Sequence, residues 1–111
     1  MSSTNVTEVA VARADEVRDC EILRVPPEGY PPIAIYRLGD AYFATDDTCS
    51  HGDASLADGF LDEDCSVECP YHAGKFDIRT GLPIALPCTE PIRAYRIDAR
   101  EGILYLTPAP G

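Results

Sequence analysis

Short apolar or alternating runs typical of β-strands dominate both ends of this chain, and no segment shows the periodicity of a long helix. Six such runs predict strands, at residues 8–12, 21–25, 32–38, 41–45, 92–97 and 103–106. Gly39-Asp40 and Arg100-Glu101-Gly102 each separate two consecutive runs and predict tight hairpins. Ten prolines and eight glycines interrupt the runs, so the pattern indicates an all-β fold, an antiparallel sandwich or barrel.

The middle of the chain, about residues 46–83, has a different, more polar character. We interpret it as a subdomain inserted into a base domain that is formed by residues about 1–45 and 84–111, the whole chain 1–111 being a single domain. Within the subdomain, residues 64–69 alternate and predict a strand. Residues 54–59 predict a single helical turn capped by Gly59.

Charge is concentrated in the same middle segment. The chain carries a net charge of −10, and residues 46–83 hold nine acidic side chains against Lys75 and Arg79, a local net charge of −7. Such a field steers a protein toward basic partner surfaces and repels nucleic acid. The alternative, that the acids only keep a small protein in solution, stays open.

Length and the N-terminal residues restrict the class of protein further. With 111 residues, the chain can form one core but has no room for a separate catalytic domain. The first eight residues contain no basic region and no apolar run of signal-peptide length, and no stretch is long enough to span a membrane. Together with an odd number of cysteines, five, these features predict a soluble cytoplasmic protein.

Two cysteine and histidine pairs provide the candidate chemistry: Cys49 with His51, and Cys69 with His72. They use both histidines of the chain. Zinc modules usually take two cysteines from one segment and two histidines from another, whereas each segment here offers one thiolate and one imidazole. This division suits a binuclear centre in which one iron has cysteine ligands and the other has histidine ligands. A tetrahedral zinc site with the same four side chains remains the alternative.

The residues around these pairs resemble the two cluster-binding loops of Rieske proteins. The resemblance covers Cys49–Asp53 and Cys69–Asp77, and it extends to Thr80-Gly81 and Leu86-Pro87. It is greatest to the small Rieske ferredoxins of bacterial aromatic-ring dioxygenase systems. The resemblance implies the Rieske fold, an antiparallel β base domain with an inserted cluster-binding subdomain, and one [2Fe–2S] cluster per chain.

The resemblance also implies a ligand set and a function. Cys49 and Cys69 would bind the inner iron, and His51 and His72 the outer one. The chain would be a monomeric electron carrier without catalytic residues. It would take single electrons from an NADH-dependent flavoprotein ferredoxin reductase and deliver them to a terminal oxygenase, which selects the aromatic substrate. No histidine remains for the mononuclear iron that an oxygenase needs. The alternatives are a fixed small subunit of another oxidoreductase, such as a nitrite-reductase-like assembly, and a zinc-stabilised binding module.

Four positions near the ligands predict a low reduction potential. High-potential relatives carry a disulfide between cysteines at the positions of Ala54 and Tyr71, and hydroxyl donors at the positions of Gly74 and Phe76. With fewer donors and a negative surrounding, adding an electron is disfavoured. We therefore expect a midpoint near or below about −100 mV, the low end of the family range.

Other residues are expected to be structural. Three cysteines outside the pairs are predicted to be buried free thiols: Cys20, Cys65 and Cys88. Three glycines are predicted to permit turns around the loops: Gly52, Gly74 and Gly81. Lys75, the only lysine, is expected to form a local ion pair, with a partner contact as the alternative. The tyrosines outside the loops are expected in the core or in cross-strand pairs.

Overall fold

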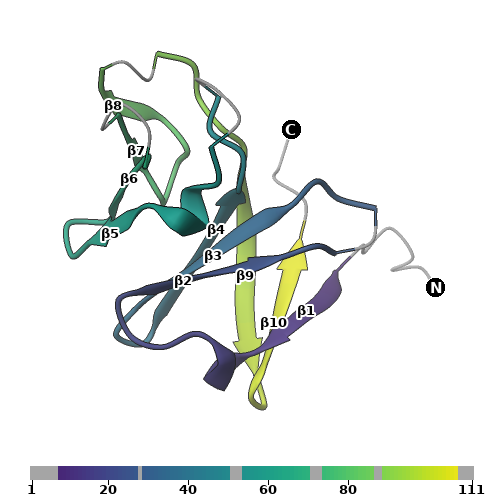
Figure 1. Cartoon of the computed structure of the whole chain (residues 1–111). Helices are drawn as coiled ribbons and strands as arrows, with labels where there is room; N and C mark the ends of the chain where they lie inside the picture. Colours follow the sequence, from purple (N-terminus) through teal and green to yellow (C-terminus); the bar gives the residue numbers. More distant parts are fainter. Residues whose placement is uncertain (1–7, 28, 51–53, 71–73, 87–88, 108–111) are drawn as a thin grey trace.

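The computed structural model describes residues 8–27, 29–50, 54–70, 74–86 and 89–107. These residues form ten strands and two single-turn 3-10 helices, and no α-helix (Figure 1). The elements are β1 (Val9–Arg13), η2 (Ala14–Glu16), β2 (Glu21–Val25), β3 (Ile33–Leu38), β4 (Ala41–Asp46), η3 (Leu56–Asp58), β5 (Phe60–Asp62), β6 (Ser66–Glu68), β7 (Lys75–Asp77), β8 (Pro83–Ala85), β9 (Ala94–Arg100) and β10 (Ile103–Thr107). The all-β prediction is confirmed. No helix of the described residues is long and apolar enough to cross a membrane.

The two ends of the chain together build one six-stranded antiparallel sheet, in the order β1-β10-β9-β4-β3-β2. Both predicted hairpins are present. Gly39 and Asp40 join β3 to β4, and Glu101 and Gly102 join β9 to β10. Gly39 has φ of +62°, the left-handed conformation that such a turn requires. The predicted strand at 92–97 begins two residues later, at Ala94, and continues to Arg100.

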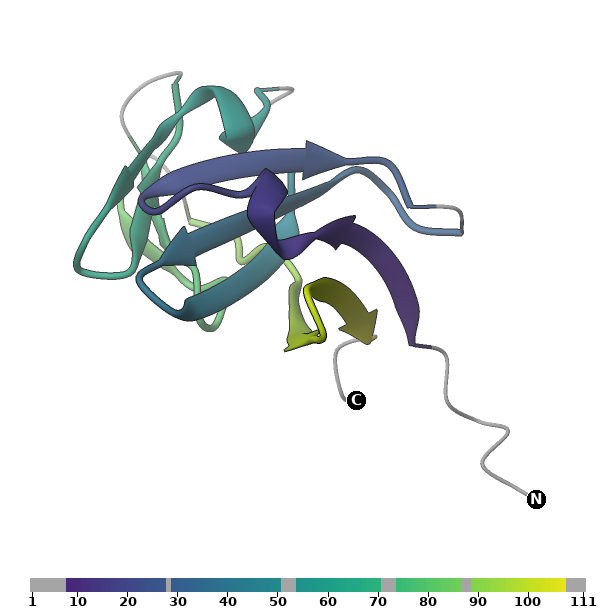
Figure 2. The ribbon, with the colours of Figure 1, turned by 90° about the horizontal axis from the view of Figure 1, so that it is seen from below.

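A second, four-stranded sheet comprises residues 60–85 in the order β5-β6-β7-β8. In both ribbon views it lies at the end of the molecule opposite to β1 and β10 (Figures 1 and 2). The predicted strand at 64–69 is shorter than expected, since Cys65 lies in a turn and β6 begins at Ser66. The predicted helical turn is η3, and the backbone N–H of Gly59 caps it by donating to the Leu56 carbonyl.

Close packing, not a left-handed backbone, explains the glycine after η3. Gly59 has φ of −92°, which any residue can adopt. A Cβ atom at this position would lie 2.1 Å from the carbonyl oxygen of Glu68, on the neighbouring strand. Gly59 therefore allows η3 and β5 to approach β6, the strand that precedes Cys69.

Strand β3 separates two hydrophobic cores, which explains its continuous apolar run. Ile33 and Ile35 pack into the core of the six-stranded sheet, with Leu104 and Leu106 of β10. On the other face of β3, Ala34 and Tyr36 belong to a second core. That second core also contains Leu56, Val67, Phe76, Ile78 and Ile92, together with Cys49 and Cys69. Both predicted cysteine ligands thus lie in the apolar layer that joins the two sheets.

The prediction for the remaining thiols is wrong for Cys20, which is exposed. Cys20 lies in the turn before β2 and has φ of +63°. Cys65 has φ of +69° in another turn and is only partly buried. Cys88 lies outside the described residues. Cys65 nevertheless packs against the second core, so a place in a turn does not by itself decide the exposure of a thiol.

The prediction for the tyrosines is confirmed at Tyr30, Tyr36, Tyr42 and Tyr95, which lie in or against one of the two cores. Tyr36 is fully buried in the second core, and its hydroxyl is 2.7 Å from the hydroxyl of Thr45. Tyr30 and Tyr95 pack edge to face, with ring centroids 5.8 Å apart. These tyrosines join strands and loops of the base sheet and are structural.

Candidate metal centre

Two loops carry the predicted ligands, and the same backbone hydrogen bond closes both. The first loop, residues 49–54, follows β4, and the N–H of Cys49 donates to the carbonyl of Ala54 over 2.9 Å. The second loop, residues 69–74, connects β6 to β7, and the N–H of Cys69 donates to the carbonyl of Gly74 over 2.7 Å. Each cysteine therefore stands at the start of a closed loop.

The structure brings Cys49 and Cys69 into one cluster, each only 2% exposed. His51 and His72 fall inside the first and second loops in the sequence but lie outside the described residues, as do Gly52 and Tyr71. The placement of the two sulfur donors therefore comes from the structure. The placement of the two imidazole donors remains a prediction from the sequence.

The described donors and their surroundings fit an iron–sulfur cluster. Two cysteines, one from each loop, lie at the edge of an apolar core formed by side chains such as Leu56 and Phe76. A thiolate is costly in such a dry environment unless a metal compensates its charge.

A buried carboxylate, Asp47, anchors the first loop. Its side chain is 2% exposed. Asp47 Oδ1 accepts the backbone N–H of Ala57 at 2.9 Å, and Oδ2 accepts the hydroxyl of Ser55 at 2.6 Å. The guanidinium of Arg24 on β2 lies 3.2 Å from the same Oδ2. Asp47 thereby connects the end of β4, the segment after the first loop, and β2.

Sequence reasoning missed this role because it counted Asp47 only as part of the acidic excess. The backbone of Asp47 forms two further hydrogen bonds. Its N–H donates to the carbonyl of Pro32 over 2.9 Å, and its carbonyl accepts the N–H of Leu56 over 2.7 Å. The only signal in the sequence was an acid two residues before a ligand cysteine.

Two more bonds connect the first loop and the end of β4 to β9 and the segment before it. The hydroxyl of Ser50 donates to the carbonyl of Glu90 over 2.6 Å. The hydroxyl of Tyr95 donates to Asp46 Oδ1 over 2.6 Å. Burial, followed by the hydrogen bond to Asp46, raises the pKa of Tyr95 to about 12, so the phenol remains a donor at neutral pH.

The second loop is supported by strand pairing. Glu68 pairs with Lys75 in the ladder between β6 and β7, directly before and after the loop. The ammonium of Lys75 lies 3.7 Å from Asp62 on β5, so the predicted local ion pair is present. Phe76, the next residue of β7, is fully buried.

The turn after β7 depends on Asp77 and Gly81. Asp77 Oδ1 accepts the backbone N–H of Arg79 at 2.8 Å, and the Asp77 carbonyl accepts the N–H of Gly81 at 2.7 Å. The hydrogen bond from the Arg79 side chain lowers the pKa of Asp77. Gly81 has φ of +80°, and a Cβ there would lie 2.0 Å from the carbonyl oxygen of Ile92, which confirms the expected need for glycine.

A family model, the Rieske [2Fe-2S] domain, matches residues 7–96. The chain belongs to the Rieske family. The ferredoxin CarAc of Metapseudomonas resinovorans is 44% identical to this Rieske chain over 96 residues, 86% of this chain and 89% of the relative. The ferredoxin component of the p-cumate 2,3-dioxygenase system of Pseudomonas putida is 46% identical over 100 residues, 88% and 83% of the two chains.

Solved structures agree with this assignment. The ferredoxin of carbazole 1,9a-dioxygenase from Nocardioides aromaticivorans IC177 superposes with a TM-score of 0.86 at 35% identity, over 92% of this chain and 98% of the other. A complex of reduced oxygenase and oxidised ferredoxin in carbazole 1,9a-dioxygenase contains a chain with a TM-score of 0.85 at 39% identity, over 94% and 95%. A small subunit of a nitrite reductase has a TM-score of 0.78 at 17% identity, which shows a common fold alone.

The predicted Rieske fold, cofactor and class of protein are therefore confirmed. The chain is a Rieske ferredoxin of the aromatic-ring dioxygenase type, with a Rieske-type [2Fe–2S] cluster. It is an electron carrier and not a catalyst. The zinc alternative is not supported. Ala54, the last residue of the first loop of this ferredoxin, is buried and has no thiol for a disulfide.

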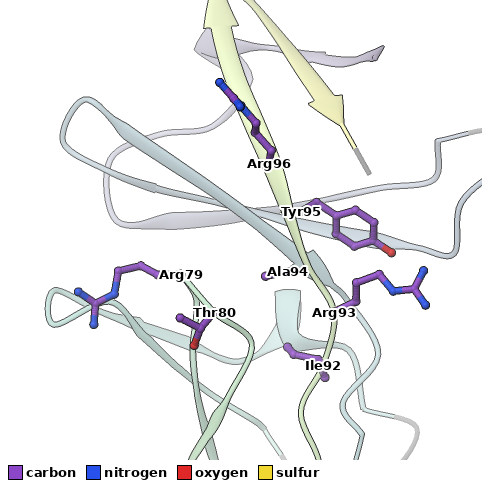
Figure 3. Close-up of a pocket in the computed structure, with 7 residues that line it drawn as sticks. All are labelled: Arg79, Thr80, Ile92, Arg93, Ala94, Tyr95 and Arg96. Atoms are coloured by element: carbon purple, nitrogen blue, oxygen red, sulfur yellow. The ribbon is translucent and has the colours of Figure 1, made fainter. Parts of the chain in front are cut away.

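A surface hollow beside the start of β9 does not form a second site in this Rieske ferredoxin. Its lining residues are Arg79, Thr80, Ile92, Arg93, Ala94, Tyr95 and Arg96 (Figure 3). Arg79 and Arg96 are paired with Asp77 and Asp98. In Figure 3, the side chain of Arg93 extends away from Arg79. Because the three cations do not converge, the hollow has no common point at which an anion would be bound.

Proposed function

We propose that this Rieske ferredoxin receives single electrons from an NADH-dependent flavoprotein reductase and passes them to the terminal oxygenase of a bacterial aromatic-ring dioxygenase system. The observation that carries the proposal is the pair of buried cysteines at the start of two equally closed loops. Support also comes from the relatives, which are ferredoxins of carbazole and p-cumate dioxygenase systems, and from the ferredoxin and oxygenase complex of the carbazole system.

The proposed ligands are Cys49 and Cys69 for the inner iron, and His51 and His72 for the outer iron. The spacing supports this assignment, since each histidine falls within the span that a cysteine N–H bond closes. When bound, the cluster supplies a one-electron couple. The protein contributes a dry, preorganised pair of thiolates and loops that are anchored from both sheets.

We also propose a midpoint potential near or below about −100 mV. Phe76 is fully buried and offers no hydroxyl, and Gly74 offers none. Residues 46–83 have a net charge of −7, which further opposes the addition of an electron. A clearly positive midpoint in protein-film voltammetry would contradict this part of the proposal.

The carrier is proposed to act as a cytoplasmic monomer that forms brief complexes. The acidic surround of the loops favours encounter with basic partner surfaces, and such steering mainly raises the association rate. We retain the division into a base domain, about 1–45 and 84–111, and a cluster-binding subdomain, about 46–83. The four-stranded sheet at residues 60–85 supports this division.

Two experiments test the function. The purified protein should be brown and should give a reduced-state electron paramagnetic resonance spectrum of Rieske type. Added in small amounts to a separately prepared reductase and the oxygenase of carbazole 1,9a-dioxygenase, it should support many turnovers per ferredoxin. A protein that transfers no electrons to the oxygenase, or works only as a stoichiometric co-purifying subunit, would exclude a free carrier.

A further inference from the structure

Strand β8 and the residues on either side of it expose their large apolar side chains, the reverse of the usual arrangement. Leu82, Ile84 and Leu86 are 54%, 55% and 77% exposed. Pro83 and Ala85, which alternate with them, are partly covered. An antiparallel sheet normally turns its large apolar residues toward the core. Here the period of a strand is kept while the large residues face solvent, which defines an apolar ridge formed by Leu82, Ile84 and Leu86.

The ridge lies on the edge of the four-stranded sheet, at the outer margin of the molecule in Figure 1. Two features oppose the addition of another strand to this edge. Pro83 has no N–H to donate. The register shifts between β7 and β8, because adjacent residues Lys75 and Phe76 pair with Ala85 and Pro83 and leave Ile84 as the extra residue of a bulge. A partner would therefore contact the side chains of the ridge and not its backbone.

Charge distinguishes the ridge from its surroundings. Residues 81–89 contain no charged side chain, whereas residues 46–79 contain all nine acids of the segment described above. Protein interfaces commonly combine an uncharged, desolvated centre with a charged rim. The matching partner surface is an apolar patch bordered by basic groups.

The ridge is connected to both cysteine loops. Ala85 of β8 pairs with Lys75, the residue that directly follows the second loop. Four residues after Leu86 in the sequence, the carbonyl of Glu90 accepts the hydroxyl of Ser50, which is next to Cys49. These two connections make an electron-transfer partner the expected occupant.

We propose that Leu82, Ile84 and Leu86 form a docking ridge for the terminal oxygenase. The proposal rests on the proposed function. The oxygenase is favoured as the occupant because a ferredoxin 39% identical to this chain has been solved in complex with its oxygenase. The ridge contributes affinity and orientation, while the acidic surround contributes encounter rate.

The test uses the holoprotein and a double variant, Ile84→Ser with Leu86→Ser. Both side chains are exposed, so the visible spectrum, midpoint potential and melting temperature should not change. Electron transfer from the dithionite-reduced ferredoxin to the oxygenase of carbazole 1,9a-dioxygenase is followed by stopped flow at increasing ferredoxin concentration. We expect the apparent Kd to rise roughly tenfold, with the rate at saturation unchanged.

Phe60→Ser is the matched control. Phe60 is 63% exposed and lies on β5, the opposite edge of the same sheet. It should alter the apparent Kd less than about twofold, as expected outside the central contacts of an interface. An equal rise in apparent Kd for Phe60→Ser would show that binding depends on general surface apolarity, and would contradict the proposed docking ridge.

Other outcomes are equally decisive. An unchanged Kd for the double variant would contradict the docking role of the ridge and leave the proposed function intact. A weakened reaction with the flavoprotein reductase alone would assign the ridge to the reductase and overturn the oxygenase assignment. A wild-type dimer that the double variant abolishes in sedimentation would assign it to a second copy. Absence of electron transfer from the wild-type ferredoxin would contradict the proposed function and, with it, the ridge.

Discussion

The first loop and the second loop are closed by the same backbone hydrogen bond, yet they are supported in different ways. The first loop is flanked by a single backbone bridge, between Thr48 and Ser55, and depends further on side chains, above all the buried carboxylate of Asp47 and the hydroxyl of Ser50. The second loop extends directly from β6 and β7, whose backbone ladder supports it. A ladder tolerates most side-chain changes, whereas a buried polar anchor does not. Single substitutions should therefore damage the first loop more readily.

Replacement of either ligand cysteine is expected to have the largest effect, and the loss should be the same for both loops. Cys49→Ser and Cys69→Ser should each abolish the cluster, because a serine oxygen is a poor replacement for a soft thiolate. The visible spectrum and the iron content of the purified variants measure this. Cys20→Ser is the matched control, and because Cys20 is exposed it should retain the full spectrum. If one of the two variants kept a normal cluster, the prediction that both cysteines are ligands would be contradicted.

Asp47→Ala is expected to lower the free energy of unfolding by about 3 kcal/mol, because it removes several buried interactions at once. Cluster occupancy should fall with it, and Asp47→Asn should be intermediate. Asp62→Ala is the control near the second loop. Its carboxylate is half exposed and, among the described residues, forms an ion pair with Lys75, so the change should stay within about 0.5 kcal/mol. Denaturant unfolding measures both, and equal losses would contradict the contrast between the loops.

Gly81→Ala tests the turn that follows the second loop. The left-handed backbone and a Cβ placed against the Ile92 carbonyl should together cost about 2 kcal/mol. Gly39→Ala is the control, since Gly39 also has positive φ but has no atom within 4 Å of the added Cβ. It should cost about 1 kcal/mol. If thermal unfolding gave equal losses, the close approach of Gly81 to Ile92 would have no energetic importance.

The smallest expected effect is a pH-dependent one at Asp77. The Arg79 hydrogen bond lowers the pKa of Asp77 in the folded state below its unfolded value of about 3.8. This carboxylate therefore contributes stability above that pH and loses it as the pH falls through the folded pKa. Unfolding of Asp77→Asn and wild type should differ at pH 7 and converge in acid. A difference that persisted unchanged at pH 2 would exclude this origin.

Local sequence patterns determined much of this protein. The alternating runs, the two hairpin turns and the spacing of the cysteine and histidine pairs depend on residues close together in the chain, and they predicted the strands and the cofactor. The continuous apolar run at 33–36 also predicted a strand, although its two-sided burial became visible only between two cores. The resemblance to Rieske ferredoxins supplied the class of protein, because few other sites combine these loops.

Only the tertiary structure decided features that depend on distant residues. Asp47 became an anchor because folding brings Arg24, Ser55 and Ala57 around one carboxylate. Residues 82–86 are apolar and uncharged in the sequence, and only the structure shows that Leu82, Ile84 and Leu86 are exposed at the bulged edge of the sheet. A sequence states which side chains are apolar or charged, but burial and partnership are set by what packs against them.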